Sequence, residues 1–206
     1  MHHSASKIDL SKDGDSSVVG WMEDTTFKVS SQVSGMKIMA NEDSGNMFNG
    51  YKNNACQNVI SITGLEKIDT SSVKNMTEMF SHAGYNATTL SIGDISNWDT
   101  SSVVAMTGMF YAAGCNSTNF TTLDLSGWNT SSLQSTYGMF DSCSTLKTIY
   151  VGDEWDMSAL TASTYMFSGC KSLVGQSGTT YNSSKVDKRM ANYETGYLTY
   201  KAPSGN

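Results

Sequence analysis

The sequence predicts an α/β solenoid, in which one strand-plus-short-helix unit is repeated and stacked between two caps. Three observations predict it: a ladder of Met-Phe pairs, a ladder of Trp residues in phase with it, and alternating apolar segments between them. The phenylalanines of the first ladder lie 32, 30, 30 and 27 residues apart, at Phe48, Phe80, Phe110, Phe140 and Phe167. A fixed period of this length is typical of stacked repeats.

The second ladder marks the start of a short helix in each unit. Its members are Ile68, Trp98, Trp128 and Trp155. Each precedes a residue with a short polar side chain that could cap a helix N-terminus: Asp69, Asp99, Asn129 and Asp156. The apolar residues that follow recur at i, i+3, i+6 and i+7, which predicts one stripe on a helix. Since helices of about ten residues are marginal alone, they must pack on their neighbours.

The segments between these helices alternate between apolar and polar residues, as in short strands. Two of them fit the pattern L-x-x-L-x-L: Phe120, Leu123 and Leu125, then Leu146, Ile149 and Val151. Alternation places these side chains on the inward face of a strand, and strands of successive units should pair in parallel. We therefore expect a right-handed leucine-rich-repeat solenoid with short parallel strands and short helices, capped at both ends.

The chain divides into four segments around the repeats. Met1-His2-His3-Ser4 resembles an expression-tag remnant, and we expect residues 1–14 to be a disordered leader without an export signal. Residues 15–56 contain two alternating stretches that predict a hairpin cap over the first strand. The repeats, with a period of 27–33, occupy residues 57–174. Residues 175–206 are polar and predict a C-terminal cap and tail.

Composition excludes several classes of protein. The net charge is −6, and the 13 Lys and Arg residues are scattered, so nucleic acid is not an expected partner. No apolar run approaches the ~18 residues of a spanning helix, so direct membrane insertion is not expected. We expect a monomer.

Two of the repeats resemble those of the BspA-like leucine-rich-repeat proteins of bacteria. They read WDTSSVVAMTGMFYAAGCNSTNFTTLDLSGW and WNTSSLQSTYGMFDSCSTLKTIYVGDEW, and the resemblance extends over about residues 60–175. It implies an exported or surface-displayed protein associated with adhesion, and hence an extracellular location. Insertions at 81–90, 93–97 and 111–122 depart from strict regularity and lie where a binding surface can vary.

The sequence offers no expected metal, cofactor or catalytic site. The cysteines Cys56, Cys115, Cys143 and Cys170 form no C-x-x-C motif and are interpreted as buried free thiols, with a Cys143–Cys170 disulfide as the alternative. Outside the first residues the only histidine is His82, interpreted as an exposed loop residue rather than a catalytic base. A row of Asp94, Asp124 and Asp153 lacks the spacing of calcium loops. We therefore expect no enzyme.

The predicted function is non-catalytic recognition or adhesion at a bacterial surface. Its expected partner is a protein or glycan of a host or neighbouring cell. The alternative is a structural spacer that displays other domains. Polar and aromatic residues on loops and strand faces are the binding candidates: Tyr85, Tyr111, Asn116, Asn119, Tyr150 and Asp153.

Overall fold

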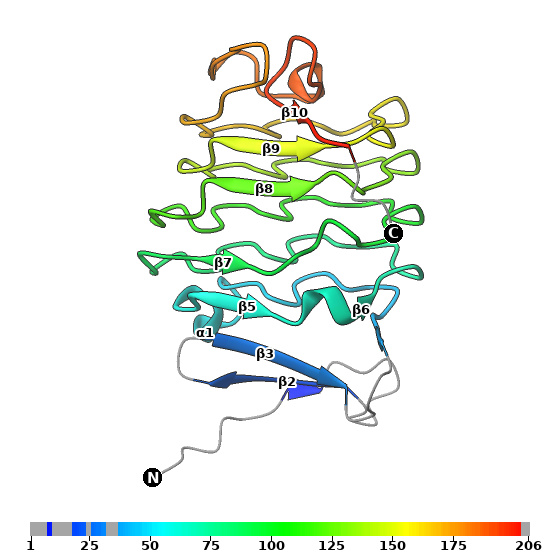
Figure 1. Ribbon diagram of the computed structural model, residues 1–206, viewed down its shortest axis with the longest axis vertical. Helices are drawn as coiled ribbons and strands as arrows, with labels where there is room; N and C mark the ends of the chain where they lie inside the picture. Colours follow the sequence, from blue (N-terminus) through cyan, green and yellow to red (C-terminus); the bar gives the residue numbers. More distant parts are fainter. Residues whose placement is uncertain (1–7, 10–17, 24–25, 32–36, 203–206) are drawn as a thin grey trace.

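The computed structural model describes residues 8–9, 18–23, 26–31 and 37–202, and Figure 1 shows them as coils stacked along one axis. The strands are β1 (Ile8–Asp9), β2 (Val18–Glu23), β3 (Thr26–Ser31), β4 (Ile38–Met39), β5 (Ser61–Thr63), β6 (Ile68–Asp69), β7 (Ser91–Ile92), β8 (Thr122–Leu125), β9 (Thr148–Val151) and β10 (Thr199–Tyr200). The helices are α1 (Asn54–Gln57) and two 3-10 turns, η1 (Leu65–Lys67) and η2 (Lys188–Met190). None of these helices is long enough to cross a membrane.

One face of the stack, called the front face here, carries two sheets. The first has the order β1-β2-β3-β5-β7, and the second has the order β10-β9-β8. Pairing between successive coils is parallel, as expected, with Ile62 opposite Ile92 and Leu123 opposite Ile149. No pairing joins β7 to β8, and Figure 1 shows these two strands farther apart than β8 and β9.

The N-terminal end of the stack is covered by an antiparallel hairpin of β2 and β3. Strand β3 then pairs in parallel with β5, so the hairpin lies over the first coil. The prediction of a disordered leader at 1–14 is wrong for Ile8–Asp9, because these residues pair with β2 as β1. The rest of that segment lies outside the described residues.

The opposite face, called the back face, is a ladder of turns rather than a row of helices. Single parallel bridges connect Asp43, Asn75, Ala105, Ser135 and Ala162 in sequence. Alternate N–H groups donate to the next coil, as from Phe80 to Met109 and from Phe110 to Met139, both at 2.8 Å. The predicted short helices are therefore wrong, because these N–H groups bond between coils and not to the i−4 carbonyl within one.

Left-handed backbone at one equivalent position of each coil explains this geometry. Glu78, Gly108, Gly138 and Tyr165 all have φ between 54° and 60°. A residue in that conformation interrupts a right-handed helix and turns the chain, at an energetic cost for the two that are not glycine. The apolar residues at i, i+3, i+6 and i+7 are therefore buried from consecutive turns of the chain and not from one face of a helix.

The predicted capping residues stabilise turns instead of helices. Asp99 Oδ1 accepts a hydrogen bond from the Ser101 N–H at 3.0 Å, and Asn129 does the same with Ser131. The threonine after each of them is buried and donates to the next coil: Thr100 Oγ1 lies 2.8 Å from the Asn129 carbonyl oxygen. One short segment therefore both closes a turn and connects two coils.

The core consists of side-chain columns that run through all the coils. The rings of Phe48, Phe80, Phe110, Phe140 and Phe167 stack with centroids 5.1, 5.4, 5.7 and 5.6 Å apart. The expectation that equivalent phenylalanines lie over one another is confirmed. Trp98 and Trp128 stack beside them at 6.5 Å, and each donates its indole N–H to the preceding coil. At the C-terminal end buried Tyr197 packs edge-on against Phe167.

Candidate functional site

Three of the six predicted binding residues line one hollow at the side of the stack, called the lateral hollow. Tyr85, Tyr111 and Asn116 surround a space of about 340 Å³ together with His82, Ala112, Cys115, Ser142, Ser144, Gly169 and Lys171. Six of these ten residues come from the inserted segments 81–90 and 111–122. Residues from four successive coils therefore meet at one place.

Left-handed turns position the residues along this hollow. His82, Ala112 and Ser142 occupy equivalent positions and have φ of 55°, 52° and 63°. Their N–H groups donate to the next coil, at 2.7 Å from His82 to the Tyr111 carbonyl oxygen and at 2.8 Å from Ala112 to that of Asp141. The same backbone bonds that stack the coils thus fix the spacing of the hollow's side chains.

Aromatic rings gather around His82 beside this hollow. Its imidazole lies 5.2 Å from the ring of Tyr85, 4.9 Å from that of Tyr111 and 5.7 Å from that of Tyr51, between centroids. The tyrosines remain exposed, from 38% for Tyr111 to 73% for Tyr51. Such rings offer apolar faces and hydroxyl groups to a ligand at small entropic cost, because each already contacts the His82 ring.

His82 is half-buried, in contrast to the exposed loop residue that was expected. Its Nδ1 lies 3.0 Å from Ser81 Oγ. Partial burial lowers the pKa of His82 below its ordinary value, and the charge of Glu78 opposes this shift. The lowered pKa favours the neutral ring, which can both donate and accept a hydrogen bond.

Asn116 fixes the loop that carries Tyr85. Its Nδ2 donates to the carbonyl oxygen of Tyr85 in the preceding coil at 2.8 Å. The amide thus orients one of the exposed rings, a positioning role that the sequence did not indicate.

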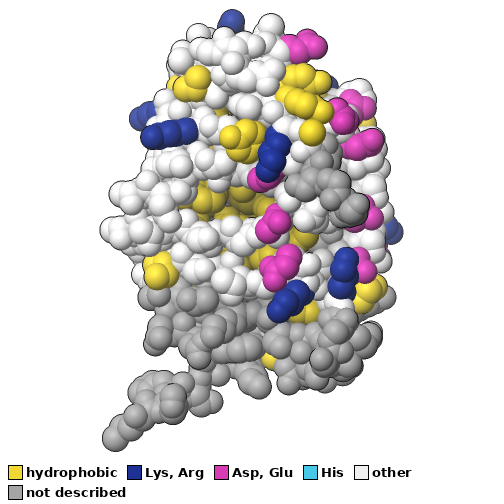
Figure 2. All heavy atoms as spheres, viewed as in Figure 1, with side chains coloured by type: hydrophobic (Ala, Val, Ile, Leu, Met, Phe, Trp, Pro, Cys, Tyr) yellow, Lys and Arg dark blue, Asp and Glu magenta, His cyan; other side chains and the backbone are white. Residues whose placement is uncertain are grey.

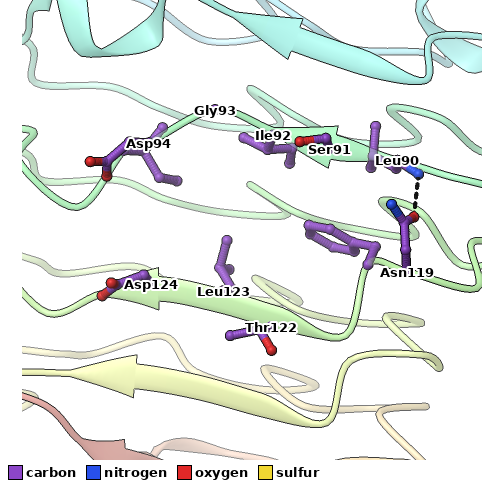
Figure 3. Close-up of a pocket in the computed structure, with 11 residues that line it drawn as sticks. Leu90, Ser91, Ile92, Gly93, Asp94, Asn119, Thr122, Leu123 and Asp124 are labelled. Carbon is purple, nitrogen blue, oxygen red and sulfur yellow. Dashed lines mark hydrogen bonds between the residues drawn. The ribbon is translucent and has the colours of Figure 1, made fainter.

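The other three predicted residues lie elsewhere. Asn119 Oδ1 accepts from the Leu90 N–H at 2.8 Å, on the front face (Figure 3). Tyr150 lies under Lys201, whose Nζ is 5.6 Å from the ring centroid, and Asp153 accepts from the Tyr200 hydroxyl at 3.1 Å. Tyr150 and Asp153 therefore contact the chain's own C-terminal strand β10.

A second hollow, called the front groove, lies between β7 and β8. Its volume is about 260 Å³. Residues 90–95 line it on the β7 side, and residues 119–120 and 122–124 line it on the β8 side. Figure 2 shows apolar side chains in a depression on this face, with Asp and Glu side chains beside it. Both hollows involve the insertions that interrupt the repeat.

The cysteines are free thiols in the structure, and no disulfide joins Cys143 to Cys170. Cys143 and Cys170 each donate the S–H to a carbonyl oxygen of the preceding coil. Cys143 donates to Phe110 and Cys170 to Phe140, both with a distance of 3.0 Å from Sγ to the oxygen. Burial raises the pKa of both thiols far above the ordinary value. Among the described residues, no group of three or more His, Cys, Asp or Glu side chains is arranged to hold a metal ion.

Sequence reasoning missed Tyr51 and treated His82 only as a possible base. The ring of Tyr51 contacts His82 from the preceding coil, and His82 in turn contacts Tyr85 and Tyr111. A signal existed in the register: His82 stands two residues after Phe80, the place that Ala112 has after Phe110.

Comparisons with known proteins give one match. Residues 42–181 match the model of a family described as "Mycoplasma protein of unknown function, DUF285". No curated protein and no solved structure matches the chain. The matched residues begin just before Asp43, the first bridge of the back face, and include all the stacked coils. Because the match spans more than half of the chain, the chain belongs to the DUF285 family, a family of bacterial surface proteins.

Proposed function

We propose that this protein is a non-catalytic recognition module on a bacterial surface, and that its lateral hollow binds a glycan or a protein of a host or neighbouring cell. The single observation that carries the proposal is the cluster of exposed rings, Tyr85 and Tyr111, held against His82 beside a hollow of about 340 Å³. Aromatic faces pack on the C–H faces of sugars or on apolar side chains. Hydroxyl and imidazole groups add hydrogen bonds with direction.

We further propose that the stack is a right-handed leucine-rich-repeat solenoid of the BspA-like type. Parallel pairing between successive coils and the continuous phenylalanine column support this assignment. Such a stack presents residues from several coils on one surface, which suits recognition of an extended ligand. An experimental structure with left-handed coiling would contradict the assignment.

The experiment is a binding screen of the whole chain on a glycan array and on an array of extracellular host proteins. A selective signal should fall at least tenfold in Tyr85→Ala/Tyr111→Ala. The matched control is Tyr137→Ala/Tyr165→Ala, because these two tyrosines are 47% and 49% exposed and also contact each other, outside the hollow. The control should bind like the wild type.

Two outcomes would overturn the proposal. One is the absence of any selective ligand on both arrays, which would favour the structural spacer. The other is equal loss of binding in the two double variants. Circular dichroism during urea denaturation checks that each variant remains folded.

A further inference from the structure

The front face carries two strand edges that face each other without pairing. Strand β7 ends the five-stranded sheet and β8 ends the three-stranded sheet, although they belong to successive coils. On the back face the same coils remain joined, with Ala105 bridged to both Asn75 and Ser135. The ladder is therefore interrupted on one face only. Paired strands lie about 4.8 Å apart, and Figure 1 shows β7 and β8 farther apart than the paired strands β8 and β9.

Unpaired backbone groups point into this gap from the β7 side. The Ser91 and Gly93 N–H groups donate to Ile60 and Ile62 on the coil before, at 2.9 and 2.8 Å. In a strand the N–H and C=O groups of successive residues point to opposite edges. The N–H and C=O of Ile92 therefore point away from β5, toward β8.

The β8 side repeats this arrangement. The Thr148 N–H of β9 donates to the Thr121 carbonyl oxygen at 3.1 Å, and Leu123 is in register with Ile149. By the same alternation, the N–H and C=O groups of Thr122 and Asp124 point toward β7. Two edges with complementary donors and acceptors thus face each other across the front groove.

The side chains around the groove define what could occupy it. Its apolar lining includes Leu90, Ile92 and Leu123, which are labelled in Figure 3, and Phe120, which precedes β8 in the chain. Asp94 and Asp124 lie at the same end of the two strands. Burial raises the pKa of Asp124, but hydrogen bonds from Lys201 and Ser126 outweigh it and hold the pKa below its ordinary value.

Lys201 already demonstrates the charge preference of this end of the groove. Its ammonium group, which follows β10, forms an ion pair with the Asp124 carboxylate. The charge of Lys201 also acts on Asp94, but Asp94 forms no ion pair of its own with a lysine or arginine among the described residues. A second cation would therefore be attracted to Asp94.

We propose that the front groove binds an extended peptide segment of a partner protein, which inserts between β7 and β8 as an additional strand and joins the two sheets. The segment alternates apolar and polar residues and carries a Lys or Arg that meets Asp94. Main-chain hydrogen bonds to both edges supply affinity, and the apolar lining and Asp94 supply selectivity. This inference concerns a site apart from the lateral hollow and does not rest on the function proposed for it.

The probe is a displayed library of ten-residue peptides with alternating apolar and polar positions and one fixed lysine, selected on the whole chain. Selection should enrich peptides that bind wild type at least tenfold more tightly than Thr122→Pro. That substitution removes an N–H that faces the groove and none that pairs with β9. Tyr85→Ala/Tyr111→Ala is the matched control and should bind the peptides like wild type, which separates this site from the lateral hollow.

Amide exchange followed by NMR then tests insertion directly. The bound peptide should slow exchange of the Ile92, Thr122 and Asp124 amides at least tenfold, while the Leu123 amide, already paired with β9, changes little. Methylating alternate peptide nitrogens in either phase should abolish binding, because an inserted strand bonds on both edges. Addition to a single edge would tolerate one of the two phases.

Asp94→Asn tests the charge preference, since the amide keeps the Oδ1 acceptor for Ser96. It should weaken lysine-bearing peptides about tenfold and leave peptides with glutamine at that position unchanged. The proposal is overturned if selection enriches no peptide, if enriched peptides leave the three amides unprotected, or if one methylation phase is tolerated.

Discussion

The indole Nε1 of Trp128 lies 2.8 Å from the carbonyl oxygen of Ile95, 33 residues earlier in the chain. Trp98 makes the same bond to Leu65 at 2.9 Å, so the bond recurs with the repeat. Each fills the core of one coil and satisfies a backbone acceptor of another. Trp155 departs from the series, because its Nε1 donates to Ala191 of the C-terminal segment at 3.1 Å.

Trp128→Phe should therefore cost about 2 to 4 kcal/mol of unfolding free energy, since it leaves a cavity and an unpaired buried carbonyl group. Trp155→Phe should cost only about 1 kcal/mol, because Trp155 is half-buried and water can replace its bond. Urea denaturation followed by circular dichroism measures both. Equal losses in the two variants would contradict the assigned role of Trp128.

Thr100→Val should cost about 1 to 3 kcal/mol, although the two side chains have nearly the same shape. The buried hydroxyl bonds the Asn129 carbonyl oxygen of the next coil at 2.8 Å, and valine leaves that oxygen unsatisfied. Thr161→Val is the matched control, because Thr161 Oγ1 makes the same kind of bond, to Gln134 at 3.0 Å, on an exposed residue. Thermal denaturation should show a much smaller loss for the control.

Asp99→Asn should leave stability within about 0.5 kcal/mol of wild type, whereas Asp99→Ala should cost about 1 kcal/mol. The turn needs one short side-chain oxygen for the Ser101 N–H, and Asn129 supplies that oxygen in the next coil. Denaturation midpoints of the three proteins check this. If asparagine were as damaging as alanine, the charge and not the turn would explain the aspartate.

Iodoacetamide at pH 8 should label Cys115 before Cys143 and Cys170. The latter two are buried, and burial raises the pKa of both, so the reactive thiolate is scarce. Cys115 is only partly buried. Mass spectrometry of the labelled peptides gives the order, and labelling in urea should remove the differences. Early labelling of Cys143 would show that the Phe column opens readily.

Stability should fall as the pH rises from 9 to 11, in part through Cys56. Burial raises the pKa of this thiol from 9.0 to about 11. Above pH 9 the unfolded thiol has lost its proton while the folded one keeps it, so proton loss favours unfolding by up to about 1.4 kcal/mol per pH unit. Cys56→Ala should show a shallower decline in urea denaturation. Parallel profiles of the two proteins would rule out this contribution.

The sequence predicted the columns of the core well, because the period places equivalent side chains at equivalent heights. Phe80 and Phe110 could be paired from spacing alone. The prediction of short helices was wrong because the spacing of apolar residues does not show whether a backbone N–H donates within its own coil or to the next coil. Gly108 and Gly138 at equivalent positions were the available signal of a left-handed turn.

The site was predicted only in part, for a related reason. Tyr85, Tyr111 and Asn116 meet because their insertions occur at the same height in neighbouring coils, which the period indicates. Tyr150 and Asp153 are partly covered by Tyr200 and Lys201, and a return of the C-terminal strand to β9 leaves no periodic trace. The missing pairing of β7 was equally invisible, because its residues alternate like those of any strand.

The one-sided interruption between β7 and β8 gives the stack a mechanical weak line. At that height the two coils are joined on the back face by the parallel bridge between Ala105 and Ser135. A pulling force along the long axis would part the front first and tilt the two halves about this bridge. Tension along this axis would then widen the opening between the sheets rather than unravel the chain.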